Sequence, residues 1–227
     1  MSKSRISLSD QCLEVGWPLT EVLAHKQNKR SWSLNGESFW PPEVVVGQMY
    51  SNAGASVNFC EGGSVLLLMK AAALDTLARL NTFNDRDDAI NRYLEAQMVI
   101  LADHTTEIIE TVRTITPDVL ARNVKELSES AMLQSFFPRV NQQFMLELFD
   151  HLGGNKLADI LQAFSAAPYD YRAGWPDLIV LQNRMIKFVE VKTSDKLLES
   201  QLRFARGIGT PMSFDCRVVR LKALQPA

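Results

Sequence analysis

The sequence predicts an α/β fold in which a mixed sheet is flanked by helices and a long helical segment is inserted into the chain. Two observations support this prediction. Apolar residues at helical spacing fill the middle of the chain, from about residue 62 to residue 164. After Pro168 the pattern changes to apolar and alternating runs in the order strand, strand, helix, strand.

Composition places the chain among ordinary globular proteins. Its 227 residues are 46% apolar and 22% charged, which suits one large domain or a catalytic domain with a modest helical addition. The sequence contains no run of 18 apolar residues, so no membrane span is expected. The first ten residues also lack the apolar stretch of a signal peptide. The three cysteines, Cys12, Cys60 and Cys216, form no CxxC pair, which argues against a zinc ribbon or a disulfide framework. We therefore expect a reducing, cytoplasmic location.

The formal net charge of −2 hides an uneven distribution of charge. Residues 168–227 contain ten Lys and Arg against six Asp and Glu, so this segment is basic and the remainder is acidic. A local basic surface matters more for binding a phosphate backbone than the charge of the whole chain does. The distribution favours nucleic-acid contacts in the C-terminal segment.

Residues 1–54 are expected to form a small helical or irregular segment that packs on the core. Pro18, Asn35-Gly36 and Trp40-Pro41-Pro42 break this region into short pieces. Three of the four tryptophans lie here, and a base-stacking role for them stays open beside the packing role.

Residues 62–80 are expected to form a buried helix that starts at Gly62-Gly63. Leu, Ala and Met are strong helix formers, and the run is too long and too poor in β-branched residues for a strand. Thr116-Pro117-Asp118 is typical of a helix start, and Gly153-Gly154 is typical of a helix end. Further helical stretches are expected over residues 85–113, 118–134, 141–151 and 155–164.

Two strands are expected over residues 177–182 and 185–192, joined by a tight turn at Asn183-Arg184. A helix over residues 197–206 and a strand over 214–222 then complete the fold. If the turn has two residues, Gln182 pairs with Met185 and Asp177 falls opposite Glu190.

This hairpin register brings three charged side chains together. Cross-strand partners hold their Cβ atoms about 4.5–5.5 Å apart on one face. Alternation of side chains along the strand places Lys192 on the same face as Glu190. Two carboxylates, from Asp177 and Glu190, therefore converge with a lysine at one end of the hairpin.

Such a set suits metal-assisted phosphodiester hydrolysis. Two adjacent carboxylates repel each other unless a cation lies between them, and a hard divalent ion with oxygen ligands removes this conflict. The ion would activate water and hold the phosphate, and Lys192 would add a positive charge. The alternative is a surface salt-bridge cluster. Against it, Asp177 follows a proline at a strand start, and Glu190 and Lys192 interrupt an apolar strand where charges are costly.

These residues carry a family resemblance. Gly174-Trp175-Pro176-Asp177, Val189-Glu190-Val191-Lys192 and Gln201 resemble the signature of PD-(D/E)xK nucleases in their virus-type replication-repair form (VRR-NUC). Residues 172–180 (RAGWPDLIV) resemble the RxGxPDLxV segment of Fanconi-associated nucleases. Cys60-Glu61-Gly62-Gly63 and Leu152-Gly153-Gly154 also have counterparts in that family.

The resemblance covers roughly residues 55–222 and implies a restriction-endonuclease-like core. Residues 55–227 would form the nuclease domain, with a helical insertion at about residues 80–165. Residues 1–54 would be a separate segment packed on it. Small viral versions without the insertion are similar to dimeric junction-cutting nucleases, so the insertion favours a monomer by analogy.

The resemblance also implies roles for the matching residues. Asp177 and Glu190 would be ligands of Mg²⁺ or Mn²⁺, together with the backbone carbonyl of Val191. Glu61 would complete the acidic set from the helical side, although an acid at a helix N-terminus is the alternative for it.

The remaining residues would act around the ion. Lys192 would position or activate the attacking water, and Gln201 would orient Lys192 or the phosphate. Candidate phosphate contacts, each with a solvated surface charge as the alternative, are Arg172, Lys196, Arg203 and Arg206.

The sequence therefore predicts a divalent-metal-dependent DNA nuclease, selective for 5′ flaps or DNA ends, in DNA repair or processing. We expect a monomer near the nucleoid or nucleus, with DNA as its partner and no membrane contact. Two alternatives stay open. One is a toxin domain that is delivered into target cells, degrades their DNA and is neutralised by an immunity protein. The other is a catalytically inactive DNA-binding module.

Overall fold

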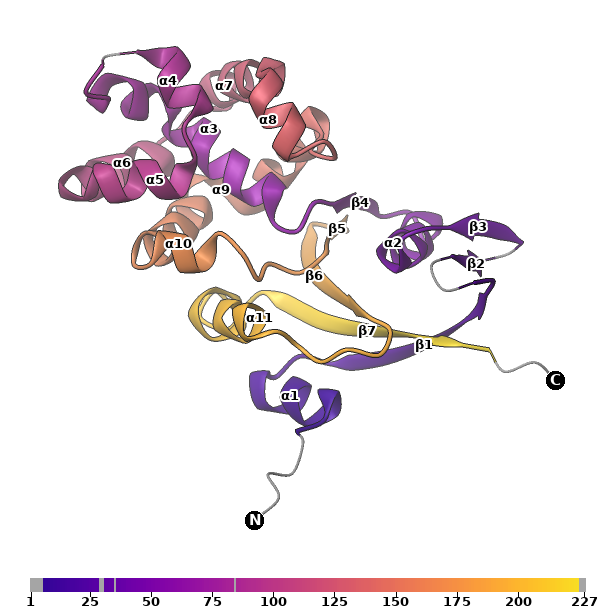
Figure 1. Cartoon of the computed structure of the whole chain (residues 1–227). Coiled ribbons are helices and arrows are strands. Elements are labelled where there is room, and N and C mark those ends of the chain that lie inside the picture. The colour runs from indigo at the N-terminus through magenta and orange to yellow at the C-terminus, as the bar shows by residue number, and fades with distance from the viewer. Residues whose placement is uncertain (1–5, 29–30, 35, 84, 225–227) are drawn as a thin grey trace. The chain divides into compact units, whose positions relative to one another are not determined.

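The computed structural model describes residues 6–28, 31–34, 36–83 and 85–224 (Figure 1). The chain divides into two compact units. The sheet unit combines Met1–Phe59 with Gly174–Ala227, and the helical unit comprises Cys60–Ala173. The N-terminal segment thus belongs with the C-terminal strands, and the inserted unit is longer than the expected residues 80–165. No helix among the described residues is both long and apolar enough to cross a membrane.

The sheet unit is built on a mixed sheet, which has seven strands within the described residues. The strands are β1 (Leu19–Lys26), β2 (Trp32–Leu34), β3 (Glu37–Phe39), β4 (Ser56–Phe59), β5 (Leu178–Gln182), β6 (Met185–Lys192) and β7 (Asp215–Ala223). Their spatial order is β3-β2-β1-β7-β6-β5-β4. Strand β7 pairs in parallel with both β1 and β6, and the other neighbouring strands pair antiparallel.

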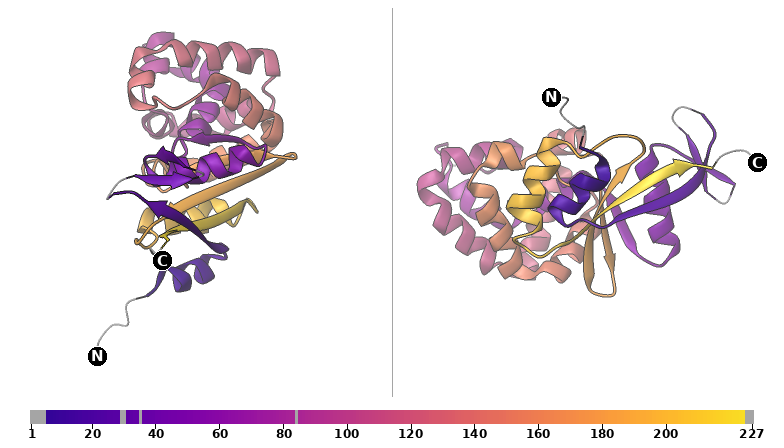
Figure 2. Two further views of the ribbon diagram at one scale, coloured as in Figure 1. Left: turned by 90° about the vertical axis from the view of Figure 1, so that its right-hand side faces the viewer. Right: turned by 90° about the horizontal axis from the view of Figure 1, so that it is seen from below.

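Helices cover both faces of this sheet (Figures 1 and 2). Helix α2 (Pro42–Asn52) lies on one face, and α1 (Leu8–Val15) and α11 (Glu199–Phe204) lie on the other. A short π-helical turn, η2 (Ala205–Gly209), continues α11. The expected mixed sheet flanked by helices is confirmed.

The N-terminal segment differs from the helical or irregular piece that its sequence suggests. It contributes β1, β2 and β3 to the sheet, and β1 pairs with β7 from Leu19 to Ala24. Only Ala24 is buried along β1, so the strand lacks the apolar alternation by which a sequence pattern is recognised. Trp17 and Trp32 are buried in the core, which excludes base stacking by these two side chains.

The two faces of β6 are packed differently. Val189 and Val191 belong to an apolar layer with Val46 of α2. Because side chains alternate along a strand, Phe188, Glu190 and Lys192 share the opposite face. There Phe188 lies among the rings of three other aromatic residues, with centroids 4.8–6.1 Å from its own: Trp175, Phe204 and Phe214.

The register of the β5–β6 hairpin is the one that the turn predicts. Gln182 pairs with Met185, and Leu178 pairs with Val189. Asn183 and Arg184 have φ angles of 52° and 61°, the left-handed conformation that a type I′ turn needs at both positions. Asp177 lies one residue before β5, level with Glu190.

The helical unit packs around α3 (Gly63–Leu80), most of which is buried. Its other helices are α4 (Arg86–Asn91), α5 (Leu94–Ile100), η1 (Ala102–His104), α6 (Thr105–Arg113), α7 (Pro117–Glu129), α8 (Ala131–Phe136), α9 (Gln142–Ser165) and α10 (Pro168–Tyr171). The expected stretches 85–113 and 118–134 are therefore broken into shorter helices. Gly153 has φ 68° and ψ 167°, which are not helical angles, so α9 consists of two helices that meet at a kink there. This agrees with the expected helix end at Gly153-Gly154.

Lys70 is a charged residue inside this apolar helix α3. Its ammonium donates hydrogen bonds to the backbone carbonyls of Ile90 and Arg92, the latter at 2.7 Å. Burial lowers the pKa of Lys70 to about 7. The lysine thus fastens the C-terminal end of α4 to α3, which is a structural role.

Gly174 brings the segment before Asp177 against the start of α11. Its φ angle is 92°, and a Cβ atom at this position would lie 2.1 Å from the backbone oxygen of Ser200. Both the backbone conformation and the close approach require glycine.

We expect Gly174→Ala to lower the free energy of unfolding by about 3 kcal/mol or more, because the methyl group must displace backbone. The control is Gly16→Ala. Gly16 also has a positive φ, but nothing lies within 4 Å of a Cβ built there, so the expected loss is about 1 kcal/mol. Urea denaturation measures both variants, and equal losses would contradict this account of Gly174.

Candidate active site

Asp177, Glu190 and Lys192 meet at one end of the β5–β6 hairpin. Glu190 and Lys192 are only 1% and 7% exposed. Lys192 Nζ and Glu190 Oε1 form an ion pair at 2.8 Å. Asp177 Oδ2 accepts a hydrogen bond from the backbone N–H of Val191, also at 2.8 Å. The sheet thus holds two carboxylates and one ammonium in a place where water is largely excluded.

Gln201 of α11 holds the glutamate from the other side. Its Nε2 donates to Glu190 Oε1 at 2.6 Å, and its Oε1 accepts from the backbone N–H of Leu198 at 2.9 Å. The family resemblance implied contacts with Lys192 or the phosphate. In the structure its amide bonds Glu190 and the backbone N–H of Leu198, and its action on Lys192 or the phosphate stays a prediction.

Burial and mutual repulsion dominate the electrostatics of the pair. Burial and, after it, the neighbouring charge of Glu190 raise the pKa of Asp177 to about 8. The pKa of Glu190 is also raised by burial, against the opposing effects of Lys192 and Gln201. Burial and mutual repulsion thus disfavour the ionised form of both carboxylates, and a cation between them would offset both effects.

Glu43 is a third carboxylate that acts on this pair. It lies in the first turn of α2, and its negative charge is a smaller cause of the raised pKa of Asp177. Its local sequence gives no sign of this role, because an acid directly after Pro41-Pro42 is the ordinary complement of a helix N-terminus.

The donor set fits a hard divalent cation in part. Among the described residues, no group of three or more His, Cys, Asp and Glu side chains forms a ready metal site. However, Glu190 Oε2 is buried and has no hydrogen-bond partner there. A buried carboxylate oxygen without a partner is costly. An ion between Asp177 and Glu190 would satisfy this oxygen and remove the repulsion, while carbonyl, water or phosphate oxygens fill its other positions.

Glu61 belongs to the helical unit, two positions beyond the end of β4. It is exposed and has a φ angle of 48°, which is uncommon for a residue other than glycine. Gly62, not Glu61, is the N-cap of α3. The place of Glu61 in the acidic set stays a prediction.

The four candidate phosphate contacts fall into both units. Lys196, Arg203 and Arg206 follow Lys192 in the sheet unit, and Arg206 already pairs with Glu14 and Glu199. Arg172 lies in the helical unit, where it pairs with Glu95 at 3.6 Å and its guanidinium lies over the ring of Tyr169. Their contacts with DNA stay predictions.

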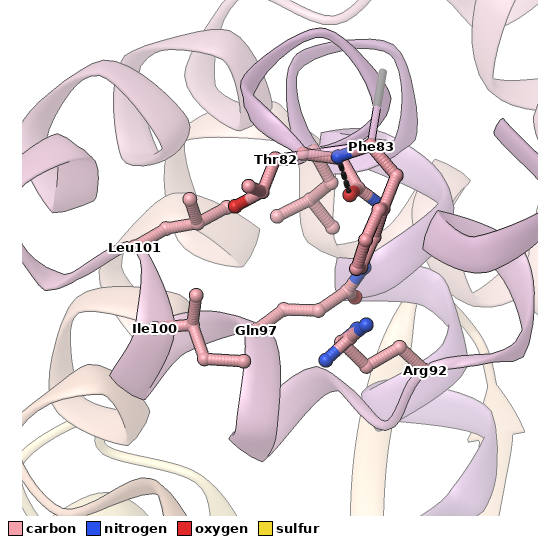
Figure 3. A pocket seen from close by; sticks show the side chains of 8 residues that line it. Thr82, Phe83, Arg92, Gln97, Ile100 and Leu101 are labelled. Atoms are coloured by element: carbon pink, nitrogen blue, oxygen red, sulfur yellow. Dashed lines mark hydrogen bonds between the residues drawn. The ribbon is translucent and has the colours of Figure 1, made fainter. Parts of the chain in front are cut away.

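A small pocket in the helical unit offers different chemistry (Figure 3). Its volume is about 180 Å³, and it is lined by Leu77, Asn81, Thr82, Phe83, Arg92, Gln97, Ile100 and Leu101. The lining contains no carboxylate, imidazole or thiol. It suits an apolar group and not a hydrolytic reaction, so the acidic pair of the sheet unit remains the candidate active site.

Comparison with known proteins supports the fold. No family model matches the sequence, and no curated protein matches it. A solved structure of paFAN1 bound to 5′ flap DNA, with a two-nucleotide flap and a gap, matches 100% of this chain with a TM-score of 0.63 and 16% identity. The chain is similar in fold to paFAN1.

A second paFAN1 structure, with a one-nucleotide 5′ flap, matches 92% of the chain with a TM-score of 0.56 and 16% identity. The chain spans only 40% and 38% of these two paFAN1 chains. At this identity the likeness concerns the fold alone. It confirms the restriction-endonuclease-like α/β fold that the resemblance to Fanconi-associated nucleases implied.

We expect Gln201→Ala to lower the free energy of unfolding by about 1–3 kcal/mol, because a buried carboxylate oxygen and a helix N–H each lose a partner. The control is Gln182→Ala, which removes an exposed hydrogen bond to the carbonyl of Ala53 and should change stability by about 0.5 kcal/mol or less. Urea unfolding compares the two. A loss of the same size in both would show that Gln201 does not hold Glu190.

Proposed function

We propose that this protein is a divalent-metal-dependent DNA nuclease that hydrolyses phosphodiester bonds. The observation that carries the proposal is the buried pair of Asp177 and Glu190, with one glutamate oxygen unpartnered and Lys192 beside it. Asp177, Glu190 and the backbone carbonyl of Val191 would hold Mg²⁺ or Mn²⁺. When bound, such an ion lowers the pKa of a coordinated water and polarises the phosphate.

The protein groups around the pair hold different oxygens of the two carboxylates. Gln201 and Lys192 occupy Glu190 Oε1, which leaves Oε2 for a cation. The N–H of Val191 fixes Asp177 through Oδ2. With a cation at Glu190 Oε2, the ammonium of Lys192 would be less firmly held by Glu190 and could hold the attacking water or a phosphate oxygen. The lysine would then stabilise the charge that develops in the transition state.

The proposed substrate is DNA with a 5′ flap or an end, in repair or processing. Two observations support this choice: the fold is similar to that of paFAN1 bound to 5′ flap DNA, and the sheet unit is basic, with fourteen Lys and Arg against ten Asp and Glu. The retained acidic pair favours an active enzyme over a binding module that has lost its catalytic acids. A toxin domain with an immunity partner has no specific observation in its favour.

We expect the wild-type protein to cut 5′ flap, single-stranded or plasmid DNA with Mn²⁺, and Asp177→Ala and Lys192→Ala each to lose activity by about 100-fold or more. The matched control is Asp215→Ala, which removes a carboxylate of the same sheet that pairs with Arg217. Gel assays with purified protein measure this. Equal activity of wild type and Asp177→Ala would exclude the proposed site.

The same assay identifies the third acid. Glu43 acts on Asp177 within the sheet unit. We therefore expect Glu43→Gln to raise the Mn²⁺ concentration needed for half-maximal activity by about 10-fold. The family resemblance implies a similar loss for Glu61→Gln. Titration of activity against Mn²⁺ for both variants shows which carboxylate completes the site, and unchanged curves for both would leave Asp177 and Glu190 as the whole acidic set.

A further inference from the structure

The face of the sheet that carries Lys192 continues onto β7 and β1. These strands run parallel to β6 and in register, so Lys192 lies beside Arg220, and Arg220 lies beside Glu21. Neighbouring strands are about 4.8 Å apart, and registered partners share a face. The three side chains therefore form a row that leads away from the acidic pair across three strands.

Cations outnumber acids along this row. Lys222 lies two residues after Arg220 on the same face of β7. Glu21 serves both, with its Oε2 at 2.7 Å from Lys222 Nζ and its Oε1 at 3.8 Å from an Nη atom of Arg220. Lys192 is already paired with Glu190. One carboxylate thus faces two cations on β7.

Arg220 also has an unused donor. Its Nε is buried and has no hydrogen-bond partner among the described residues. A buried N–H without an acceptor costs free energy, and neighbouring positive charges on a sheet repel. Both costs fall if an anion binds here.

The exposure of the cationic side chains increases with their distance from the acidic pair. The relative exposure of the side chain alone rises from 9% for Lys192 to 31% for Arg220 and 44% for Lys222. The cations therefore lead from the buried end of the hairpin to the solvent. An extended polyanion fits such a series better than a single small anion does.

We propose that Arg220 and Lys222 form a phosphate-binding strip, the β7 strip, which holds the backbone of a DNA strand next to the acidic pair. The choice of DNA as the polyanion rests on the proposed function. The guanidinium of Arg220 presents several donors to phosphate oxygens, and Lys222 adds a point charge. Glu21 is the internal competitor that holds both side chains while DNA is absent.

Strand β7 also supplies a matched control. Arg217 has the same relative side-chain exposure as Arg220, 31%, but lies on the opposite face. Its guanidinium contacts both carboxylate oxygens of Asp215 at 2.6 Å, so its charge is satisfied within the protein. Arg217→Gln removes the same charge from the same strand without touching the β7 strip.

The experiment measures binding of a fluorescent 5′ flap duplex to the full chain in EDTA, so that cleavage does not interfere. Across a series of salt concentrations, Arg220→Gln and Lys222→Gln should each reduce the slope of log K against log[salt] by about 1 and weaken binding several-fold. Arg217→Gln should bind like the wild type. Glu21→Gln should bind more tightly than the wild type, because it frees both cations.

Arg220→Lys guards against a folding defect, since it keeps the charge and should retain the wild-type slope. Equal slopes for Arg220→Gln, Arg217→Gln and the wild type would overturn the β7 strip, and so would a wild type that binds no DNA. Because the assay contains no metal, a strip confirmed here stands even if the cleavage assay fails. A strip overturned here leaves the proposed cleavage untouched if the active-site variants lose activity.

Discussion

The turn at Asn183-Arg184 sets the register of the β5–β6 hairpin, and the candidate active site depends on that register. A shift by one residue would move Glu190 and Lys192 to the face that now packs on α2, where Val189 and Val191 lie. The apolar residues on both faces of β6 resist such a shift. The same packing that fixes the strand thus forces two carboxylates into a place where neither is well solvated.

The protein compensates for that burial with groups from separate segments. Lys192 and Gln201 share one oxygen of Glu190, while the backbone of Val191 holds Asp177. Gly174 allows α11 to approach closely enough for Gln201 to reach the glutamate. What remains uncompensated is Glu190 Oε2 and the repulsion between the two acids. In this account a divalent cation completes the site, and the unfavourable electrostatics of the metal-free pair favour its binding.

The parts of this arrangement that depend on residues close in sequence can be predicted from the sequence. The two-residue turn, the alternation of β6 and the pairing level of Asp177 with Glu190 all follow from residues within sixteen positions of one another. The parts that depend on distant pairing are not. Strand β1 carries few buried residues, and its partner β7 lies almost two hundred positions away. The row from Lys192 to Arg220 and Glu21 exists only because of that pairing.

Sequence context alone also fails to separate structural from functional charges. Lys70 and Lys192 both interrupt apolar runs, but one caps backbone carbonyls and the other pairs with a buried acid. The sequence around Glu43 predicts an ordinary acid at a helix N-terminus, although its charge also raises the pKa of Asp177. In each case the partner in space, and not the local pattern, decides the role.

The most direct test of this account is the location of Mn²⁺ by anomalous diffraction from crystals of the full chain grown with the ion. The account predicts an anomalous peak bound by Asp177 and by Glu190 Oε2, with Lys192 withdrawn from Glu190. A structure at saturating Mn²⁺ in which the Glu190–Lys192 pair is intact and no ion contacts Asp177 would contradict it.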